Sequence, residues 1–430
     1  SGTTGLPKPC IISHTRYRMA ACIFSIFGSF CPGMVVYPGG LPLYHSAAGI
    51  LCVSSIIKSG ATMLIRKKFS ASSFTKDCIK YNVNAIQYIG EMARYLVNTS
   101  SNDSNDDLYK LLNIKYAFGN GLAKDVWNDF KTKYNINRII EFYASTEGNI
   151  SLFNSTGQIG ALGYMPPFLN FLYPVKLLQY NEDDPSQPKR NINGNCLLVS
   201  SMQTGLAVNK LSSSSSFSSS NSNNGNDNTT ERRFDGYAGL TKEQNEKKIL
   251  TNVLVDNDRY FNSGDLLYHD NEGFYYFGDR VGDTFRWKGE NVSTTEVEAA
   301  LDKIPNIKES CVYGIQIPGY DGKVGMATII IANNIDDNKN SLDFNNYHNI
   351  IKNILPVYAR PAFIRFATKI PTTSTHKHQK QPLIKMKLEI DENDTTSINL
   401  GIYHINPTNG VATLLSDAMR KQIHEGSFKI

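Results

Sequence analysis

The first eight residues of the chain bring hydroxyl groups, glycines and a lysine together in one short segment, Ser1-Gly2-Thr3-Thr4-Gly5-Leu6-Pro7-Lys8. Gly2 and Gly5 let backbone N–H groups approach an anion without obstruction by a Cβ atom, and the hydroxyls and the ammonium add donors and charge. The segment is not a Walker loop, because its glycine spacing is too short and Pro9 stands where that loop has a magnesium-binding Ser or Thr. Taken alone, the segment predicts either a polyphosphate-binding loop or a flexible linker.

This loop and four later segments resemble, in the same order, the motifs of the adenylate-forming superfamily. The superfamily includes acyl-CoA synthetases, luciferases and the adenylation domains of peptide synthetases. The later segments are Tyr143–Glu147 (YASTE), Ser263–Asp265 (SGD), Gly278–Arg280 (GDR), and Lys377 followed by Lys380 and Leu383.

Four longer strings narrow the resemblance to the fatty acid transport protein / very-long-chain acyl-CoA synthetase branch. They are Leu41–Ala47, Arg66–Ser72, Arg233–Tyr237 and Gly282–Ser293. The similarity covers nearly the whole chain apart from one low-complexity insert. Because members of this branch carry the phosphate loop well inside the chain, after a hydrophobic N-terminal segment, the resemblance also implies that this sequence is a C-terminal fragment.

The reaction that the resemblance implies joins a carboxylate to the α-phosphorus of ATP, releases pyrophosphate, and then passes the acyl group to the thiol of CoA. Two anions must meet, so positive charge and Mg²⁺ are expected at the site. The residues that would hold the phosphates are Ser1, Gly2, Thr3, Thr4, Gly5, Lys8 and Thr146. Glu147 would help to hold Mg²⁺, which prefers carboxylate and phosphate oxygens. The alternative for Glu147 is a solvated carboxylate at a strand end.

The same resemblance assigns the nucleotide contacts. Asp265 would accept the ribose hydroxyls, which requires an acceptor-only side chain, and Arg280 would contact sugar or phosphate. The segment Gly119-Asn120-Gly121 would pack against adenine, with Tyr143 stacked on its other face. His45 lies where the family places a residue near the substrate carboxylate, although a packed structural histidine is an equal alternative.

Lys377 is the residue that the resemblance makes catalytic, bridging carboxylate and α-phosphate oxygens as negative charge builds. Ser374 departs from the family, which has glycine there, and a lysine in a basic tail is the alternative. The C-terminal domain would rotate about Gly282 for the second half-reaction, since glycine absorbs a large φ/ψ change at low cost. Gly289, Glu290 and Asn291 would then line the path of the pantetheine arm.

Composition limits the class of protein. A chain of 430 residues is long enough for two or more domains. Its net charge of +5 suits anionic ligands such as ATP and CoA and is too diffuse to indicate nucleic-acid binding. Seven scattered cysteines without a C-x-x-C pair indicate buried thiols rather than a disulfide or zinc framework. The most apolar run, Met19–Phe30, contains Ser and Gly and is typical of a buried helix rather than a membrane span.

The elements that must position these residues follow a βαβ rhythm up to Tyr143. The expected strands are Val35–Tyr37, Thr62–Ile65, Ala85–Ile89, Tyr116–Gly119 and Ile139–Tyr143. The expected helices are His14–Phe30, Ser46–Ser59, Ser72–Tyr81, Glu91–Val97 and Lys124–Tyr134. This rhythm predicts an α/β fold with a mostly parallel, helix-covered sheet and ligands at the carboxyl ends of the strands.

Later segments predict a small β subdomain after Gly157 and an α+β cap domain at the C-terminus. In the cap we expect a capping box of Ser293 and Glu296 on a helix Thr294–Lys303. Further expected elements are strands Ile307–Ile315, Ala327–Ile331 and Phe363–Phe366 and a helix Phe344–Leu355. The expected domains are 1–278, with a disordered Ser/Asn insert at 211–230, a hinge at 279–284, and the cap at 285–430.

The leading functional interpretation is an AMP-forming ligase that joins long- or very-long-chain fatty acids to CoA and so drives their uptake. The alternatives are a lipid transport protein with vestigial ligase chemistry, or a ligase for another acid such as a bile acid. The branch implies membrane association of the full-length protein, with the catalytic domain facing the cytosol at the endoplasmic reticulum, plasma membrane or peroxisome. The sequence leaves open the acyl chain length, the membrane and whether the chain forms a homo-oligomer.

Overall fold

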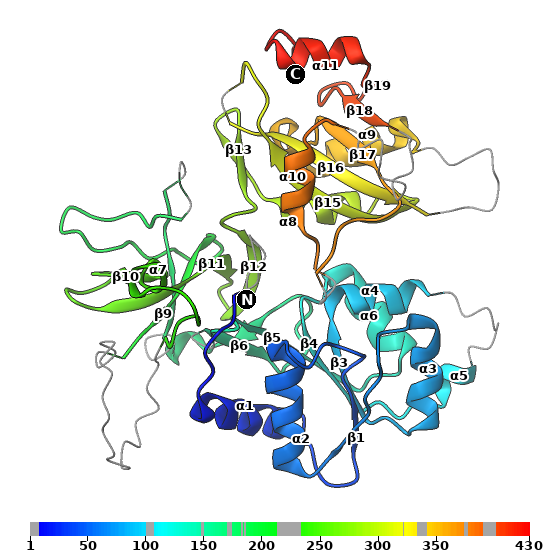
Figure 1. Ribbon diagram of the computed structural model, residues 1–430, viewed down its shortest axis with the longest axis vertical. Helices are drawn as coiled ribbons and strands as arrows, with labels where there is room; N and C mark the ends of the chain where they lie inside the picture. Colours follow the sequence, from blue (N-terminus) through cyan, green and yellow to red (C-terminus); the bar gives the residue numbers. More distant parts are fainter. Residues whose placement is uncertain are drawn as a thin grey trace.

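The computed structural model describes residues 8–99, 107–147, 150–169, 174–181, 184, 186–212, 234–320, 322–332, 342–373, 377–389 and 401–430. Three parts follow one another along the chain (Figure 1). They are a helix-covered sheet, a β subdomain beside it, and a C-terminal domain that lies over both. The predicted α/β fold with a smaller α+β cap is confirmed.

The first sheet has six strands in the order β2-β1-β3-β4-β5-β6, and only the β5–β6 pair is antiparallel. The strands are β1 (Val35–Tyr37), β2 (Thr62–Met63), β3 (Ala85–Ile89), β4 (Tyr116–Asn120), β5 (Arg138–Ala144) and β6 (Ser151–Asn154). The helices are α1 (His14–Phe27), the π-helix η1 (Ala47–Cys52), α2 (Val53–Ser59), α3 (Ala71–Lys80), α4 (Gly90–Asn98), α5 (Asp107–Lys110) and α6 (Lys124–Lys133).

Helices cover both faces of this sheet because its strands are apolar on both sides. One face carries Val36, Ala85, Phe118 and Ile140, which pack with residues of α1 and α2. The other carries Tyr37, Ile86, Ala117 and Ile139, which pack with residues of α3, α4 and α6. The alternation along each strand therefore places consecutive side chains in two separate cores.

Two predicted helices differ clearly from the structure, and the other predicted helices shift by only one or two residues at their ends. The first ends at Phe27 rather than Phe30, because Ser29 adopts a positive φ of 47° and the Phe30 N–H donates to Ser25 O at 3.1 Å. This pairing is typical of a helix C-terminus closed by a left-handed residue. The predicted helix Ser46–Ser59 is divided into the π-helix η1 and the α-helix α2.

The predicted β subdomain is a second, antiparallel sheet in the order β7-β12-β11-β9-β8, with β10 paired to β11. Its strands are β7 (Gly163–Tyr164), β8 (Val175–Leu178), β9 (Gly205–Lys210), β10 (Ile249–Thr251), β11 (Arg259–His269) and β12 (Phe274–Arg280). The 3₁₀ turn η2 (Pro167–Leu169) and helix α7 (Lys242–Glu246) also belong to this part.

The predicted Ser/Asn insert 211–230 lies outside the described residues except for Leu211 and Ser212. Leu211 is 3% exposed and packs with Phe234, Tyr237 and Phe261. Burying a leucine side chain contributes about 1.5–3 kcal/mol. Leu211 is therefore part of a core, and a boundary for the insert at residue 211 is wrong.

The C-terminal domain has one continuous core. A β13–β14 hairpin (Phe285–Trp287, Glu290–Val292) precedes the sheet β15-β16-β17-β18-β19, in which β16 and β17 are parallel. These strands are β15 (Ile307–Ile315), β16 (Val324–Ile331), β17 (Phe363–Phe366), β18 (Ile402–Ile405) and β19 (Ala412–Leu414). The helices are α8 (Thr294–Leu301), α9 (Phe344–Ile354), the 3₁₀ turn η3 (Val357–Ala359), α10 (Lys380–Met386) and α11 (Asp417–His424).

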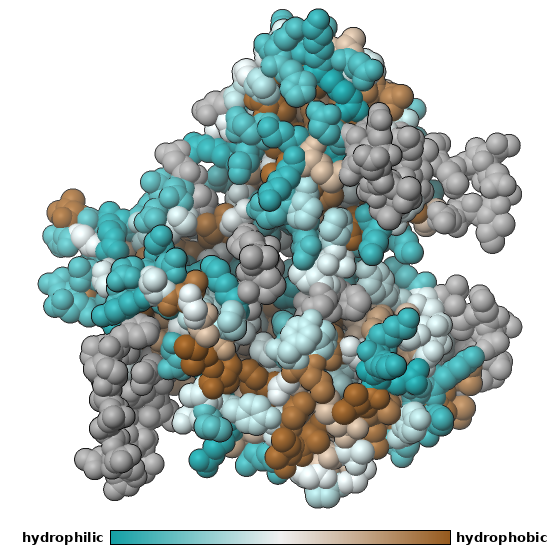
Figure 2. Space-filling view, in the orientation of Figure 1, coloured by the Kyte–Doolittle hydropathy of each residue, from teal (hydrophilic) through white to brown (hydrophobic). Residues whose placement is uncertain are grey.

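In the described part of the chain, no helix combines the length and the apolar character needed to cross a bilayer. Apolar residues nevertheless gather on one face of the first domain, over α1 and α2 at the bottom of the view (Figure 2). Ile26 of α1 and Ile57 of α2 are 72% and 71% exposed.

Candidate functional site

A cavity of about 2610 Å³ lies where the three parts of the chain meet. It exceeds the roughly 300–1,000 Å³ of an ordinary small-molecule pocket. Its walls include most of the residues predicted for the site: Lys8, His45, Asn120, Gly121, Tyr143, Thr146, Glu147, Asp265, Arg280, Gly282, Asn291 and Lys377. Gly119, Gly289 and Glu290 are not among the lining residues. Ser1, Gly2, Thr3, Thr4, Gly5 and Ser374 lie outside the described residues.

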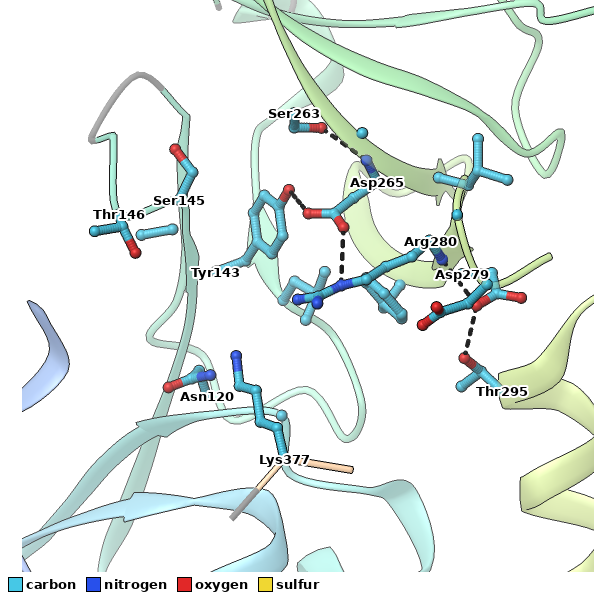
Figure 3. A pocket seen from close by; sticks show the side chains of 18 of the residues that line it. Asn120, Tyr143, Ser145, Thr146, Ser263, Asp265, Asp279, Arg280, Thr295 and Lys377 are labelled. Atoms are coloured by element: carbon cyan, nitrogen blue, oxygen red, sulfur yellow. Dashed lines mark hydrogen bonds and ion pairs between the residues drawn. The ribbon is translucent and has the colours of Figure 1, made fainter. Parts of the chain in front are cut away.

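Tyr143, Asp265 and Arg280 form one connected group (Figure 3). Tyr143, near the end of β5, donates its hydroxyl to Asp265 Oδ2 at 2.5 Å. Arg280 Nε, at the end of β12, lies 3.3 Å from Asp265 Oδ1. Burial raises the pKa of Asp265, although the guanidinium of Arg280 and the hydroxyl of Tyr143 oppose that shift. Both carboxylate oxygens are thus oriented before any ligand contacts them.

Lys377 extends from the C-terminal domain into the same cavity, and its ammonium points toward the region of Asn120 and Tyr143 (Figure 3). The backbone of Lys377 is fixed by two hydrogen bonds with Thr373, at 2.8 and 3.1 Å. Loss of water around the ammonium and repulsion from Arg280 lower the pKa of Lys377 to about 8, with Asp265 opposing. A cation so placed is suited to neutralise an anion brought into the cavity.

His45 also lines the cavity, in the turn before η1. Its Nδ1 accepts the backbone N–H of Ala47 at 3.2 Å. Burial and the charge of Lys377 lower the pKa of His45 to about 4. The neutral ring therefore carries its proton on Nε2, the atom that remains for a ligand.

The turn after β4 is held by a buried carboxylate. Glu141 on β5 accepts the N–H groups of Gly121 and Leu122 on Oε1, at 2.5 and 3.2 Å, and the Tyr88 hydroxyl on Oε2 at 2.5 Å. Gly121 has a positive φ of 79°. A Cβ on Gly119 would lie 2.2 Å from the Tyr88 carbonyl oxygen. The packing against Tyr88 therefore requires glycine at position 119. The family resemblance instead explains this glycine by the close approach of adenine.

The described residues predicted for phosphate and metal, Lys8, Thr146 and Glu147, also line the cavity. Glu147 is 6% exposed and accepts the hydroxyl of Tyr237. The ammonium of Lys8 lies 5.9 Å from the centre of the Tyr237 ring. Within the described ranges, no group of three or more His, Cys, Asp or Glu side chains is arranged to hold a metal. A single hard carboxylate fits Mg²⁺ that is bound mainly by nucleotide phosphates.

The predicted hinge Gly282 lies in the connection between β12 and β13. Asp279, at the end of β12, spans this connection: its Oδ2 accepts the Thr294 N–H at 2.7 Å and the Thr284 hydroxyl at 3.0 Å. Half of the predicted capping box is present, since Ser293 Oγ accepts the Glu296 N–H at 3.3 Å. The Asp279 carboxylate adds a second acceptor at the start of α8.

From the sequence alone, Glu141 and Tyr237 have no predicted role at the site, and Asp279 is included only within the predicted hinge 279–284. A glutamate within an otherwise apolar strand is a signal, because a buried carboxylate requires donors. Tyr237 and Asp279 stand inside strings that carry the family resemblance, but their partners are 90 and 15 residues away in the chain. Only the folded arrangement reveals those contacts.

Comparisons with known proteins find relatives that match the whole chain. The model for the AMP-binding enzyme family matches residues 1–170, and the model for the AMP-binding enzyme C-terminal domain matches residues 296–377. Long-chain fatty acid transport protein 6 of Homo sapiens is 37% identical over 430 residues, covering 100% of this chain and 64% of that protein. Long-chain fatty acid transport protein 2 of Rattus norvegicus is 42% identical over 385 residues, covering 90% of this chain and 57% of that protein. The chain thus spans less than two thirds of these relatives.

Solved structures support the fold. ATP-bound MatB from Rhodopseudomonas palustris matches with a TM-score of 0.68 at 19% identity, covering 90% of this chain and 66% of that one. The o-succinylbenzoate CoA synthetase MenE from Bacillus subtilis, in complex with ATP and a magnesium ion, matches with a TM-score of 0.62 at 19% identity, covering 90% and 68%.

Proposed function

Because the chain belongs to the AMP-binding enzyme family, in the branch of the long-chain fatty acid transport proteins, we propose that the full-length protein is a fatty acid:CoA ligase. It activates a long- or very-long-chain fatty acid as an acyl-adenylate and transfers the acyl group to CoA. The observation that carries the proposal is the position of Lys377, which reaches from the C-terminal domain into a cavity that also contains Asp265, Arg280 and Tyr143.

In the first half-reaction, the fatty acid carboxylate attacks the α-phosphorus of ATP and pyrophosphate leaves. Lys377 supplies a compact ammonium near the reacting oxygens, where a preorganised cation is most effective. The neutral His45 donates from Nε2 to the substrate carboxylate. Lys8 and Thr146 bind the leaving phosphates. Glu147, together with phosphate oxygens, would hold Mg²⁺, whose charge offsets that of the triphosphate.

The nucleoside is held by groups that the fold orients in advance. Asp265, already fixed by Tyr143 and Arg280, accepts the ribose hydroxyls. In the turn Gly119-Asn120-Gly121, tied to Glu141, Asn120 and Gly121 line the cavity and lie against adenine, and the Tyr143 ring covers the other face of the base. Preorganisation of this kind lowers the entropy lost on binding.

In the second half-reaction, the CoA thiol attacks the acyl carbonyl and AMP leaves. We propose that the segment 279–284 is the hinge about which the cap, residues 285–430, rotates away, withdrawing Lys377. Gly289 and Glu290 are exposed in the present arrangement, and rotation brings them with Asn291 to the pantetheine path. Glycine at position 282 permits the required backbone change.

The proposal is tested by measuring pyrophosphate release from the full-length protein with ATP, Mg²⁺ and CoA. The acids offered are palmitate, a C24 fatty acid, cholate and a short-chain control. Release that depends on the fatty acids and yields their CoA thioesters supports the proposal. A preference for cholate would assign a bile acid ligase instead, and no release with any acid would favour a transport protein with vestigial chemistry.

We also propose that the full-length protein acts at a membrane, with the catalytic domain on the cytosolic side where ATP and CoA are available. The relatives' names describe transport of a lipid, and a long-chain fatty acid partitions into bilayers. Co-sedimentation of the full-length protein with lipid vesicles tests this assignment, and complete recovery in the supernatant contradicts it.

A further inference from the structure

An arginine of the first domain contacts a carboxylate of the C-terminal domain. Arg94 on α4 lies with one terminal nitrogen 3.1 Å from Asp302 Oδ2, in the turn after α8. Its other terminal nitrogen donates to Asp125 Oδ2, in the first turn of α6, at 3.0 Å. The Arg94 side chain is 17% exposed. One guanidinium thus joins a carboxylate of its own domain to a carboxylate across the domain boundary.

Glu91 of α4 and His378 of the C-terminal domain also influence each other electrostatically, although burial raises the pKa of Glu91 and so weakens its charge. Glu91 lies one turn before Arg94 on α4, and its Oε2 is buried without a hydrogen-bond partner among the described residues. Across the boundary, His378 Nε2 lies 2.7 Å from Glu309 Oε1 on β15. Burial lowers the pKa of His378, but contacts with Cys311 and Glu309 and the charge of Glu91 outweigh it and raise the pKa to about 10. The raised pKa favours the imidazolium form of His378.

The ion pair between Arg94 and Asp302 joins α4 to the C-terminal domain. The first domain presents Glu91 and Arg94 from one face of α4, and the C-terminal domain presents His378 and Asp302. Figure 1 shows α4 on the side of the first domain nearest to α8 and α10. His378 directly follows Lys377 in the chain and is paired with Glu309 on β15, so docking of the C-terminal domain on α4 also fixes where Lys377 enters the cavity.

We propose that Arg94 is a positioning residue for adenylation: its ion pair with Asp302 docks the C-terminal domain on α4 and so holds Lys377 at the reacting groups. This inference rests on the proposed ligase function and adds a cross-domain contact to it. Rotation about Gly282 carries Asp302 and His378 away from α4, so the pair stabilises only one of the two domain arrangements. A ligand or contact that favours one state alone shifts the equilibrium toward that state.

The chain offers a matched pair of substitutions. Asp302→Asn and Asp125→Asn each remove one negative charge that contacts Arg94, at nearly the same distance. Only Asp302 belongs to the other domain. A general loss of charge around Arg94 would affect both variants, whereas a docking role affects only Asp302→Asn. Because Asp125 is more exposed than Asp302, at 55% against 20%, the contrast in domain position is read from the two half-reactions and not from the size of the effect alone.

The experiment measures both half-reactions in the full-length protein. Adenylation is followed by fatty-acid-dependent exchange of pyrophosphate into ATP, and thioester formation by mixing CoA with pre-made acyl-adenylate. Losing a partly buried hydrogen bond between charged groups should lower the equilibrium constant for docking about tenfold. We expect Asp302→Asn to slow adenylation about tenfold without slowing thioester formation, and Asp125→Asn to change either rate less than about threefold.

A readout independent of activity separates this inference from the proposed function. Spin labels at Ile57→Cys on α2 and Val411→Cys in the cap, with the exposed Cys31 replaced by Ser, report the distance between domains. Asp302→Asn should add a second distance population and Asp125→Asn should not. An unchanged distance in Asp302→Asn, or equal damage to both half-reactions, overturns the docking role. Label movement in a protein without ligase activity would support docking and reject the proposed function.

Discussion

Tyr143 and Asp265 stand 122 residues apart in the chain and are joined by a hydrogen bond of 2.5 Å from the tyrosine hydroxyl to the carboxylate. The bond connects the end of the parallel sheet to strand β11 of the β subdomain. It couples a ring proposed to stack on adenine to a carboxylate proposed to bind ribose. The two ends of a nucleoside would thus be recognised by one rigid unit.

Replacing Tyr143 by Phe keeps the ring and removes the hydroxyl, so it isolates this coupling. A hydrogen bond to a charged group contributes about 1.5–3 kcal/mol, and Asp265 would lose this donor while keeping its contact with Arg280. We expect the KM for ATP to rise about tenfold and kcat to change less. Tyr164→Phe on β7 is the control. The test compares the ratio of kcat/KM for ATP to kcat/KM for 2′-deoxy-ATP in the two proteins. If this ratio is the same for Tyr143→Phe and for the unmodified protein, the coupling is disproved.

The pH dependence of adenylation should report the charge on Lys377. Its pKa is lowered to about 8, so the ammonium is present below that pH and is lost as the pH rises through it. We expect kcat/KM for adenylation to fall above about pH 8. His45, with its pKa lowered to about 4, stays neutral throughout and contributes no step between pH 6 and 9.

Lys377→Arg provides the control for that profile, because a guanidinium keeps its charge far above pH 8. The variant should be slower at neutral pH, owing to its different shape, and should lack the decline above pH 8. A decline of the same size in Lys377→Arg would show that another group titrates.

Glu141 should affect ATP binding through the turn that it holds. In Glu141→Ala, Gly121 and Leu122 lose their acceptor, and we expect the KM for ATP to rise about tenfold. In Glu141→Gln, the amide oxygen still accepts those N–H groups, so the KM should rise only a few-fold. Equal KM values for the two variants would mean that the turn does not depend on this acceptor.

The same residue predicts a change of stability with pH. Burial raises the pKa of Glu141 to about 8, although the hydrogen bonds from Tyr88, Leu122 and Gly121 oppose this shift. In an unfolded chain the pKa of a glutamate is about 4.3. Between these values the folded state binds the extra proton, so the contribution to stability falls as pH rises from about 4.3 to 8. Glu141→Gln should reduce the loss of Tm between pH 6 and pH 8.5. An identical loss in both proteins contradicts this assignment.

The sequence predicts best several short strands in which apolar residues predominate. The bounds of Val35–Tyr37, Ala85–Ile89 and Phe363–Phe366 match the structure at both ends, since short apolar runs bounded by turn residues have few alternatives. Helix α10 was missed because no apolar periodicity marks it. Its end is fixed instead by Arg365, which donates to the Lys387 and Glu389 carbonyls.

For the site, the motifs predict which residues are brought together but not how each is held. Lys377 and Asp265 reach one cavity, as their motifs imply. The contacts of Glu141 with Gly121, and of Arg94 with Asp302, join segments that carry no shared pattern. Such contacts depend on the packing of whole elements, and a local sequence pattern does not contain that information.

His45 has two interpretations that one substitution can separate. If Nε2 donates to the substrate carboxylate, His45→Ala should lower kcat/KM for the acid about tenfold and leave Tm nearly unchanged. If the ring is mainly the acceptor for the Ala47 N–H, the Tm should fall instead. We expect the first result, because the ring lines the cavity. A lower Tm with unchanged kinetics would assign His45 to structure alone.

Substitutions at Lys377 and at Gly282 should each slow a different half-reaction. Lys377→Ala removes a preorganised charge, which costs about 3 kcal/mol or more, so acyl-adenylate formation should slow at least about a hundredfold. The same variant, given pre-made acyl-adenylate and CoA, should form thioester at a nearly normal rate, because the cap has then turned and withdrawn the lysine. Gly282→Pro should do the reverse: a fixed φ restricts rotation and spares adenylation more than thioester formation. Equal loss of both half-reactions in Lys377→Ala would reject alternation of the domains and leave Lys377 a structural residue.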